Sequence, residues 1–225
     1  MNKFPIILLF VVSCVFAVSA QIDGNPENMC RNGFFPRDAE NYSLATVIAK
    51  KRERVYFYSD EDDCPNGKTC RTKSYLIGKD EVIVSRKFGK WVCAWYQPAR
   101  GSETVGWIEE SRLKFADPSV SLIDEWLGEW SFYENSIKIA KGKSENEYKI
   151  TGEAFWKGLG DNVHIGELDG IAKFSDSKFE YGFDQTGEYD CRATLRPLGN
   201  YLIVSDNLNC GGANVTFSGV YRRKK

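Results

Sequence analysis

The sequence contains little histidine and no excess of either charge. Among its 225 residues there is one histidine, His164, and 30 basic residues stand against 31 acidic ones. A single histidine cannot build the usual zinc sites, so we expect no metal and no cofactor. A nearly neutral chain without a basic block also argues against nucleic acid or an anionic membrane surface as the main partner.

The sequence also lacks the motifs of several enzyme classes. It has no Gly-x-Ser-x-Gly nucleophile elbow, and a cysteine–histidine pair would need a free thiol. The glycine-rich segment 157–162 lacks the lysine and hydroxyl residue of a phosphate-binding loop. The acidic run 60–63 continues into Cys64 and Pro65, which do not fit a calcium-binding loop. We therefore expect no enzymatic activity, although the 31 acidic residues leave a carboxylate pair for glycoside cleavage open.

Only one long apolar run is present, and it lies at the start of the chain. Residues 1–20 have one lysine, an apolar stretch and a small-residue end at Ala20, which predicts a secretory signal peptide and export to the periplasm. Since no later run is long enough to span a bilayer, we expect no transmembrane segment. In a competing interpretation, the segment Val11-Val12-Ser13-Cys14 is a lipobox and Cys14 carries a lipid anchor. The apolar run continues past Cys14, which favours cleavage after Ala20.

Cysteine is well represented, because six cysteines remain when Cys14 is set aside from the seven. An even number in an exported chain indicates disulfide bonds rather than metal thiolates. Proximity in the sequence favours three pairs, namely Cys64–Cys70, Cys191–Cys210 and, from what remains, Cys30–Cys93.

Short β-like runs separated by turn signals fill the rest of the sequence, and no segment keeps a helical period, which predicts an all-β protein. We expect a leader at 21–41, a first β domain at 42–116 and a second β domain at 117–225. The second domain has seven or eight runs, and closure into an antiparallel barrel of about eight strands would remove its exposed edges. A short helical turn at 120–126 is expected to plug one end of this barrel.

The first domain resembles the bacterial SH3 (SH3b) family. The resemblance rests on RVYFYSD, on the hairpin from Gly78 to Val84 with the following KWVCAWY, and on the closing TVGWIEESRL. It implies a small barrel that recognises cell-wall peptides or proteins that act on the wall. In such a barrel we expect Trp91, Val92 and Trp107 to form the core. The residues expected to line a binding groove, with acidic groups at its rim, are Tyr56, Tyr58, Trp95, Tyr96, Asp60, Asp62 and Asp63.

The second domain is similar to lipocalin-like barrels in two places. Gly128 and Trp130 form a Gly-x-Trp motif in its first run, and Tyr221-Arg222-Arg223 ends its last run. The resemblance implies that an arginine stacks on the tryptophan at the closed end of the barrel. His164 and Glu167 lie close together in DNVHIGELDG and are further candidate binding residues, although a plain strand-end histidine is the alternative.

Together these patterns predict an exported bacterial binding protein that recognises peptidoglycan or a cell-wall-acting protein of the envelope. The alternative is an inhibitor or immunity protein that neutralises a lysozyme- or amidase-like toxin with a rigid loop, at 158–166 or 64–70. A third hypothesis, small-ligand binding in the second barrel, needs an apolar cavity and fails if Trp156, Phe174 and Phe179 fill the interior.

Overall fold

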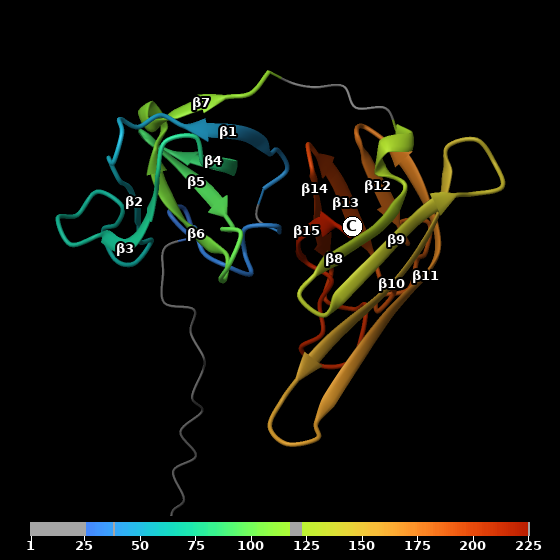
Figure 1. Ribbon diagram of the computed structural model, residues 1–225. Coiled ribbons are helices and arrows are strands. Elements are labelled where there is room, and N and C mark those ends of the chain that lie inside the picture. Colours follow the sequence, from blue (N-terminus) through green and yellow to red (C-terminus); the bar gives the residue numbers. More distant parts are fainter. Residues whose placement is uncertain (1–25, 38, 118–122, 225) are drawn as a thin grey trace, which may run out of the picture.

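The computed structural model describes residues 26–37, 39–117 and 123–224 (Figure 1). The predicted signal peptide and Cys14 lie outside these residues. Within them, strands dominate and the helical segments are two short 3-10 turns, so the all-β prediction is confirmed. None of the helices in the described ranges is long and apolar enough to cross a membrane.

The first half forms a seven-stranded antiparallel sheet in the order β3-β2-β6-β5-β4-β1-β7. Its elements are β1 (Ser43–Val47), β2 (Val55–Tyr58), β3 (Arg71–Leu76), β4 (Glu81–Phe88), β5 (Trp91–Tyr96), β6 (Thr104–Glu109), the turn η1 (Glu110–Arg112) and β7 (Leu113–Phe115). All seven strands contribute to one buried apolar cluster, from Val47 and Leu113 at one end of the sheet to Leu76 at the other. The sheet therefore curls around its own core.

The second half forms a closed antiparallel barrel of eight strands, which confirms the predicted closure. The turn η2 (Ile123–Trp126) precedes β8 (Gly128–Phe132), β9 (Asn135–Lys141), β10 (Glu147–Lys157), β11 (Val163–Ser175), β12 (Lys178–Tyr181), β13 (Ala193–Leu198), β14 (Tyr201–Asp206) and β15 (Gly219–Arg223). Aromatic side chains fill the interior, among them Phe179 and Tyr221, with Phe174 and Trp156 packed against them.

One end of the barrel is closed by stacked side chains. The rings of Trp126 and Trp130 are stacked at 5.8 Å, and the guanidinium of Arg223 lies 4.7 Å above the Trp130 ring. Arg223 also donates a hydrogen bond to the Leu127 carbonyl at 2.8 Å. Gly128 has φ of 121°, and a Cβ at this position would lie 3.1 Å from the Arg223 Nη1 atom. The expected arginine–tryptophan stack is present, and of the turn expected at 120–126 the part at Ile123–Trp126 is present, while 120–122 lie outside the described residues.

A third buried cluster joins the sheet to the barrel and explains the aromatic residues of β5. Side chains alternate along a strand, so Val92 and Ala94 face the core of the first sheet. Trp91, Cys93 and Trp95 face the other way, yet they are buried too. The leader covers this second face from one side, and Ile203 and Val220 of the barrel pack against it from the other.

The three predicted disulfide bonds are present. Cys30–Cys93 ties the leader to β5, Cys64–Cys70 closes a short loop between β2 and β3, and Cys191–Cys210 joins two segments beside the barrel. Their sequence separations are 63, 6 and 19 residues. The Cys30–Cys93 disulfide holds the leader against the sheet next to Trp107. The Trp107 indole donates a hydrogen bond to the Asn28 carbonyl of the leader.

Candidate functional site

Trp95 is buried, which corrects the prediction that it lines a binding groove. Its exposed fraction is 2%. The Tyr201 ring of the barrel meets it edge-on at 5.6 Å, and its indole donates to the Glu103 carboxylate at 2.6 Å. Burial raises the pKa of Glu103, and the hydrogen bond from the indole offsets part of that rise. The prediction grouped Trp91 with Val92 as core, which breaks the alternation along β5. Trp91 and Trp95 share one face, and the leader and the barrel occupy the face that Trp95 was expected to offer to a partner.

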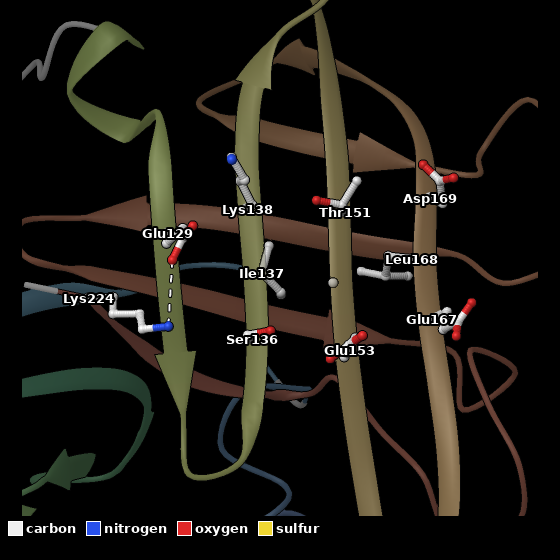
Figure 2. A pocket seen from close by; sticks show the side chains of 11 residues that line it. Glu129, Ser136, Ile137, Lys138, Thr151, Glu153, Glu167, Leu168, Asp169 and Lys224 are labelled. Atoms are coloured by element: carbon white, nitrogen blue, oxygen red, sulfur yellow. Dashed lines mark ion pairs between the residues drawn. The ribbon is translucent and has the colours of Figure 1, made fainter.

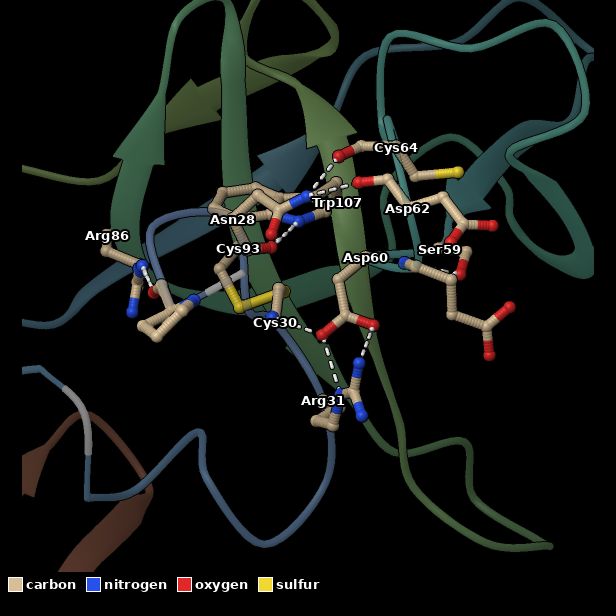
Figure 3. A network of polar contacts seen from close by, with 12 residues as sticks. Asn28, Cys30, Arg31, Ser59, Asp60, Asp62, Cys64, Arg86, Cys93 and Trp107 are labelled. Carbon is tan, nitrogen blue, oxygen red and sulfur yellow. Dashed lines mark hydrogen bonds and ion pairs between the residues drawn. A yellow bond between two sulfur atoms is a disulfide. The ribbon is translucent and has the colours of Figure 1, made fainter. Parts of the chain in front are cut away.

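Asp60 is also buried, so its predicted place on the rim of a groove is wrong (Figure 3). Its carboxylate accepts hydrogen bonds from the backbone N–H of Cys30 at 2.7 Å and from Arg31 Nε at 2.8 Å. These contacts fasten the leader to the sheet. Asp62 and Asp63 are exposed in the neighbouring loop.

Two of the candidate tyrosines are engaged in packing. The Tyr58 ring lies 4.5 Å from the Trp91 ring, within the third cluster. Tyr96 packs against the core of the first sheet, and burial is the main cause that raises the pKa of its hydroxyl. Both side chains are half-buried, so each leaves only part of its ring to solvent.

Tyr56 belongs to an exposed arrangement of arginines and tyrosines on β2 and β3, here called the cation–aromatic cluster (Arg54, Tyr56, Arg71 and Tyr75). Tyr56 and Tyr75 are direct cross-strand neighbours with ring centroids 6.0 Å apart. Arg71 lies 4.6 Å from the Tyr56 centroid and Arg54 lies 4.3 Å from that of Tyr75. Sequence reasoning found only Tyr56, because the partners become neighbours only once the β2–β3 register is known.

His164 and Glu167 do not form a joint site. They lie three residues apart on β11, so their side chains point to opposite faces of the strand. The His164 ring lies 5.1 Å from the Trp156 ring, and its Nδ1 donates to the Ala213 carbonyl at 2.5 Å. Glu167 is exposed on the outer face, opposite Glu153.

Within the described residues, Asp63, Cys64 and Cys70 are the only group of three or more side chains whose ligand atoms lie close enough to share a metal ion. Both cysteines are joined in a disulfide bond, and a disulfide sulfur is not a thiolate ligand. The two cysteines therefore close the loop covalently and offer no thiolate to a metal ion.

The most prominent surface feature is the hairpin of β10 and β11, which projects beyond the rest of the barrel (Figure 1). The register of β9 with β10 ends at the pair Ser136–Glu153, and the register of β12 with β11 reaches back only to Ala172. The two strands of the hairpin stay paired with each other as far as Lys157 and Val163. The end of the hairpin is thus a two-stranded ribbon outside the barrel wall.

Apolar side chains are exposed along the outer face of this ribbon and at its tip. Phe155 and Ile165 are direct cross-strand neighbours, and Val163, paired with Lys157 two positions nearer the tip, lies on the same face. Leu159, in the turn, is 97% exposed and Ile165 is 52% exposed. We call these four residues the hairpin patch. The predicted loop 158–166 is therefore partly strand, and its exposed side chains are the apolar ones.

The root of the hairpin is held to the barrel by hydrogen bonds. The Asn135 side chain accepts from the Phe155 backbone N–H at 3.0 Å and donates to the Thr216 carbonyl at 3.1 Å. On the other strand, the Gly212 N–H donates to the Ile165 carbonyl at 3.2 Å. Each strand of the ribbon is thereby fixed at the point where it leaves the barrel.

Packing on the inner face of the hairpin adds to these bonds. The rings of Trp156 and His164 lie in tilted contact on this face, and Cys210 of the Cys191–Cys210 disulfide lies next to the ribbon. Gly166 allows this close approach, since a Cβ there would lie 2.4 Å from the Cys210 carbonyl oxygen. Hydrogen bonds and side-chain packing therefore hold the ribbon that carries the hairpin patch in a fixed position relative to the barrel.

A polar depression of about 420 Å³ lies beside the hairpin on the outer face of β8 to β11 (Figure 2). Four carboxylates and two ammonium groups line it: Glu129, Glu153, Glu167 and Asp169, with Lys138 and Lys224. Lys224 pairs with Glu129 at 3.6 Å, and Asp169 pairs with Lys149. Glu153 and Glu167 face each other without an ion pair in the described part of the chain.

Comparisons of the chain with protein-family models, with curated proteins and with solved structures give no match. The functional conclusion therefore depends on the geometry of the two exposed surfaces, the hairpin patch and the cation–aromatic cluster.

Proposed function

We propose that the protein is a non-enzymatic, exported bacterial binding protein whose β10–β11 hairpin docks into a cell-wall-acting protein of the envelope. Its action is that of an inhibitor or immunity protein against a lysozyme- or amidase-like toxin. The observation that carries the proposal is the hairpin patch, because four apolar side chains are exposed together on a ribbon that leaves the barrel.

The hairpin patch has the size and chemistry of an anchor for a partner. Burial of one large aliphatic or aromatic side chain contributes about 1.5–3 kcal/mol, and a few such residues supply most of the binding energy of a typical interface. Leu159 has almost its whole surface available for this purpose. The other predicted loop, 64–70, has no large apolar side chain among the exposed ones, so it offers no comparable anchor.

The bracing of the root supports an inhibitory mode of binding. A ribbon that is already held in one geometry loses little conformational freedom on docking, which favours affinity. The Asn135 bridge and the Gly212 bond supply this preorganisation from the two sides of the ribbon. A convex, rigid hairpin is suited to entering the cleft of an enzyme, where it would exclude the substrate.

Small-ligand transport in the barrel is disfavoured by the packing of the interior. Phe179 is fully buried, and Phe174 and Trp156 pack against the same cluster. The small-ligand hypothesis was expected to fail if these three residues filled the interior of the barrel.

Recognition of peptidoglycan is the second candidate, and the cation–aromatic cluster favours it. Tyrosine rings stack on sugar rings, and arginines pair with carboxylates of the peptide stems. The cluster lies on the domain that resembles the SH3b family, which implies cell-wall binding. The buried Trp95 and Asp60 take no part, so this candidate depends on a smaller surface than the sequence predicted.

A capture experiment tests the proposal. The full mature chain is immobilised and exposed to envelope extract of the producing cells, in parallel with Leu159→Asp and with Ile48→Asp, a control that alters an exposed apolar residue of the first sheet. We expect a cell-wall-acting protein to be retained by the wild type and the control and lost with Leu159→Asp. Equal retention by all three contradicts hairpin docking. Sedimentation with purified peptidoglycan, lost with Tyr75→Ala, identifies the second candidate instead.

A further inference from the structure

The outer face of the β10–β11 ribbon carries a regular sequence of cross-strand pairs. From the barrel toward the tip, the pair Glu153–Glu167 is followed directly by the apolar pair Phe155–Ile165. All four side chains are exposed or partly exposed on the same face, since strand residues two apart point the same way. The hairpin patch is therefore adjoined by two carboxylates on its barrel side.

The Glu153–Glu167 pair is an unfavourable element of the free protein. Directly opposed side chains in an antiparallel sheet have Cβ atoms about 5 Å apart, and like charges in these positions are destabilising. The lysines nearby do not neutralise this pair, because Lys149 pairs with Asp169 and Lys138 makes no ion pair with either glutamate among the described residues. Lys224 pairs with Glu129 (Figure 2). Neither glutamate has an ion-pair partner within the described ranges.

We infer that the hairpin's partner is a cationic protein, with an apolar cleft that takes the hairpin patch and a basic rim that meets Glu153 and Glu167. This inference rests on the proposed function and specifies the partner's chemistry. Charge complementarity carries it: the depression beside the hairpin patch holds four carboxylates against two ammonium groups. A basic rim relieves the Glu153–Glu167 repulsion on binding, while an acidic partner would add to it.

The same substitution is therefore expected to act in opposite directions on the free protein and on the complex. Glu153→Gln/Glu167→Gln removes the repulsion, so the melting temperature of the free protein should rise. Loss of both charges should weaken binding about tenfold at low salt, mainly through slower association, and the difference should shrink at high salt. A merely structural role of the two residues would not separate stability from affinity in this way.

The test uses the full mature chain, envelope extract of the producing cells as the probe, and three variants. These are Glu153→Gln/Glu167→Gln, Leu159→Asp, and the matched control Glu145→Gln, an exposed glutamate in the turn before β10. For the protein that the wild type retains, association and dissociation are measured at 50 mM and at 500 mM NaCl, values about threefold on either side of physiological ionic strength.

The expected result is a basic protein, lost with Leu159→Asp, bound about tenfold more weakly by the double glutamine variant and normally by Glu145→Gln. If retention requires Leu159 but is indifferent to Glu153, Glu167 and salt, the inference is overturned and the proposed function stands. If no retained protein depends on Leu159, both are overturned. A salt-sensitive dimer of the chain alone, dispersed by the double variant, would identify a second copy as the occupant and also overturn the inference.

Discussion

Replacement of Asp60 by alanine should destabilise the protein without affecting the exposed surfaces. The substitution leaves the buried backbone N–H of Cys30 without its acceptor and removes the ion pair of Arg31. An unsatisfied buried donor costs about 1–3 kcal/mol. The Arg31 side chain is 31% exposed, so water can replace part of its contact, and that loss is at most about 1 kcal/mol. The sum is a loss of about 1–4 kcal/mol in the free energy of unfolding.

Urea unfolding followed by tryptophan fluorescence measures this loss, with the Cys30–Cys93 disulfide intact in every sample. Asp63→Ala is the matched control, because Asp63 is an exposed carboxylate of the same acidic run, and it should change stability by no more than about 0.5 kcal/mol. Asp60→Asn should fall between the two, since an amide oxygen still accepts from Cys30. Asp60→Ala as stable as Asp63→Ala would refute the argument that this carboxylate fastens the leader.

Three further outcomes follow from single contacts. Burial raises the pKa of Glu103 above its ordinary value of 4.5, so the folded state keeps the carboxyl proton to higher pH than the unfolded state and stability falls as pH rises above 4.5. Glu103→Gln should remove this part of the pH dependence. Melting temperatures measured from acid to neutral pH test the change. Arg223→Gln should lower the free energy of unfolding by about 1–2 kcal/mol in urea, because the stack on Trp130 and a carbonyl bond are lost. Replacement of Cys191 and Cys210 by alanine should cost about 3 kcal/mol in the same assay, from the entropy of closing a loop with a separation of 19 residues.

Much of the fold could be predicted because short sequence patterns indicate its strands and turns. Alternating short runs and turn residues determine strands, and the number of runs after residue 117 predicted a closed barrel. Disulfide partners followed from proximity and an even count. The stack of Arg223 on Trp130 followed from a short motif at each end of the barrel sequence. Each of these predictions came from a count, a spacing or a short motif that can be read directly in the sequence.

The burial of Trp95 could not be predicted in the same way. Alternation along β5 places Trp95 on the face opposite Val92, but the pattern alone cannot say what covers that face. The cover comes from Tyr201 and Val220, more than 100 positions later, and from the leader. An aromatic residue out of phase with a small core is consistent with either a ligand surface or a second core, and only the packing of the barrel distinguishes them.

The exposure of the hairpin patch could not be predicted either, because the sequence does not show where the barrel wall ends. In a barrel strand, Phe155 and Ile165 read as ordinary apolar positions, because the sequence does not reveal that β9 stops pairing at Glu153. Once the pairing ends, the same outward positions that would be polar on a barrel wall carry apolar side chains on a free ribbon. Three residues of the hairpin patch lie within the candidate loop at 158–166, and only the β10–β11 register shows that Phe155 joins them from the facing strand.

The third cluster separates residues that join the parts of the molecule from residues that remain exposed to a partner. The residues that the sequence offered as a groove, Trp95 and Asp60, attach the leader and the barrel to the first sheet. Side chains that are buried between the leader, the sheet and the barrel cannot contact a partner, so a partner can bind only to the side chains that remain exposed. Of these, the cation–aromatic cluster is already internally satisfied by arginines over tyrosine rings, while the side chains of the hairpin patch are 39–97% exposed. Uncovered apolar surface gains most from a partner, which is why the hairpin, and not the sheet, is assigned the binding role.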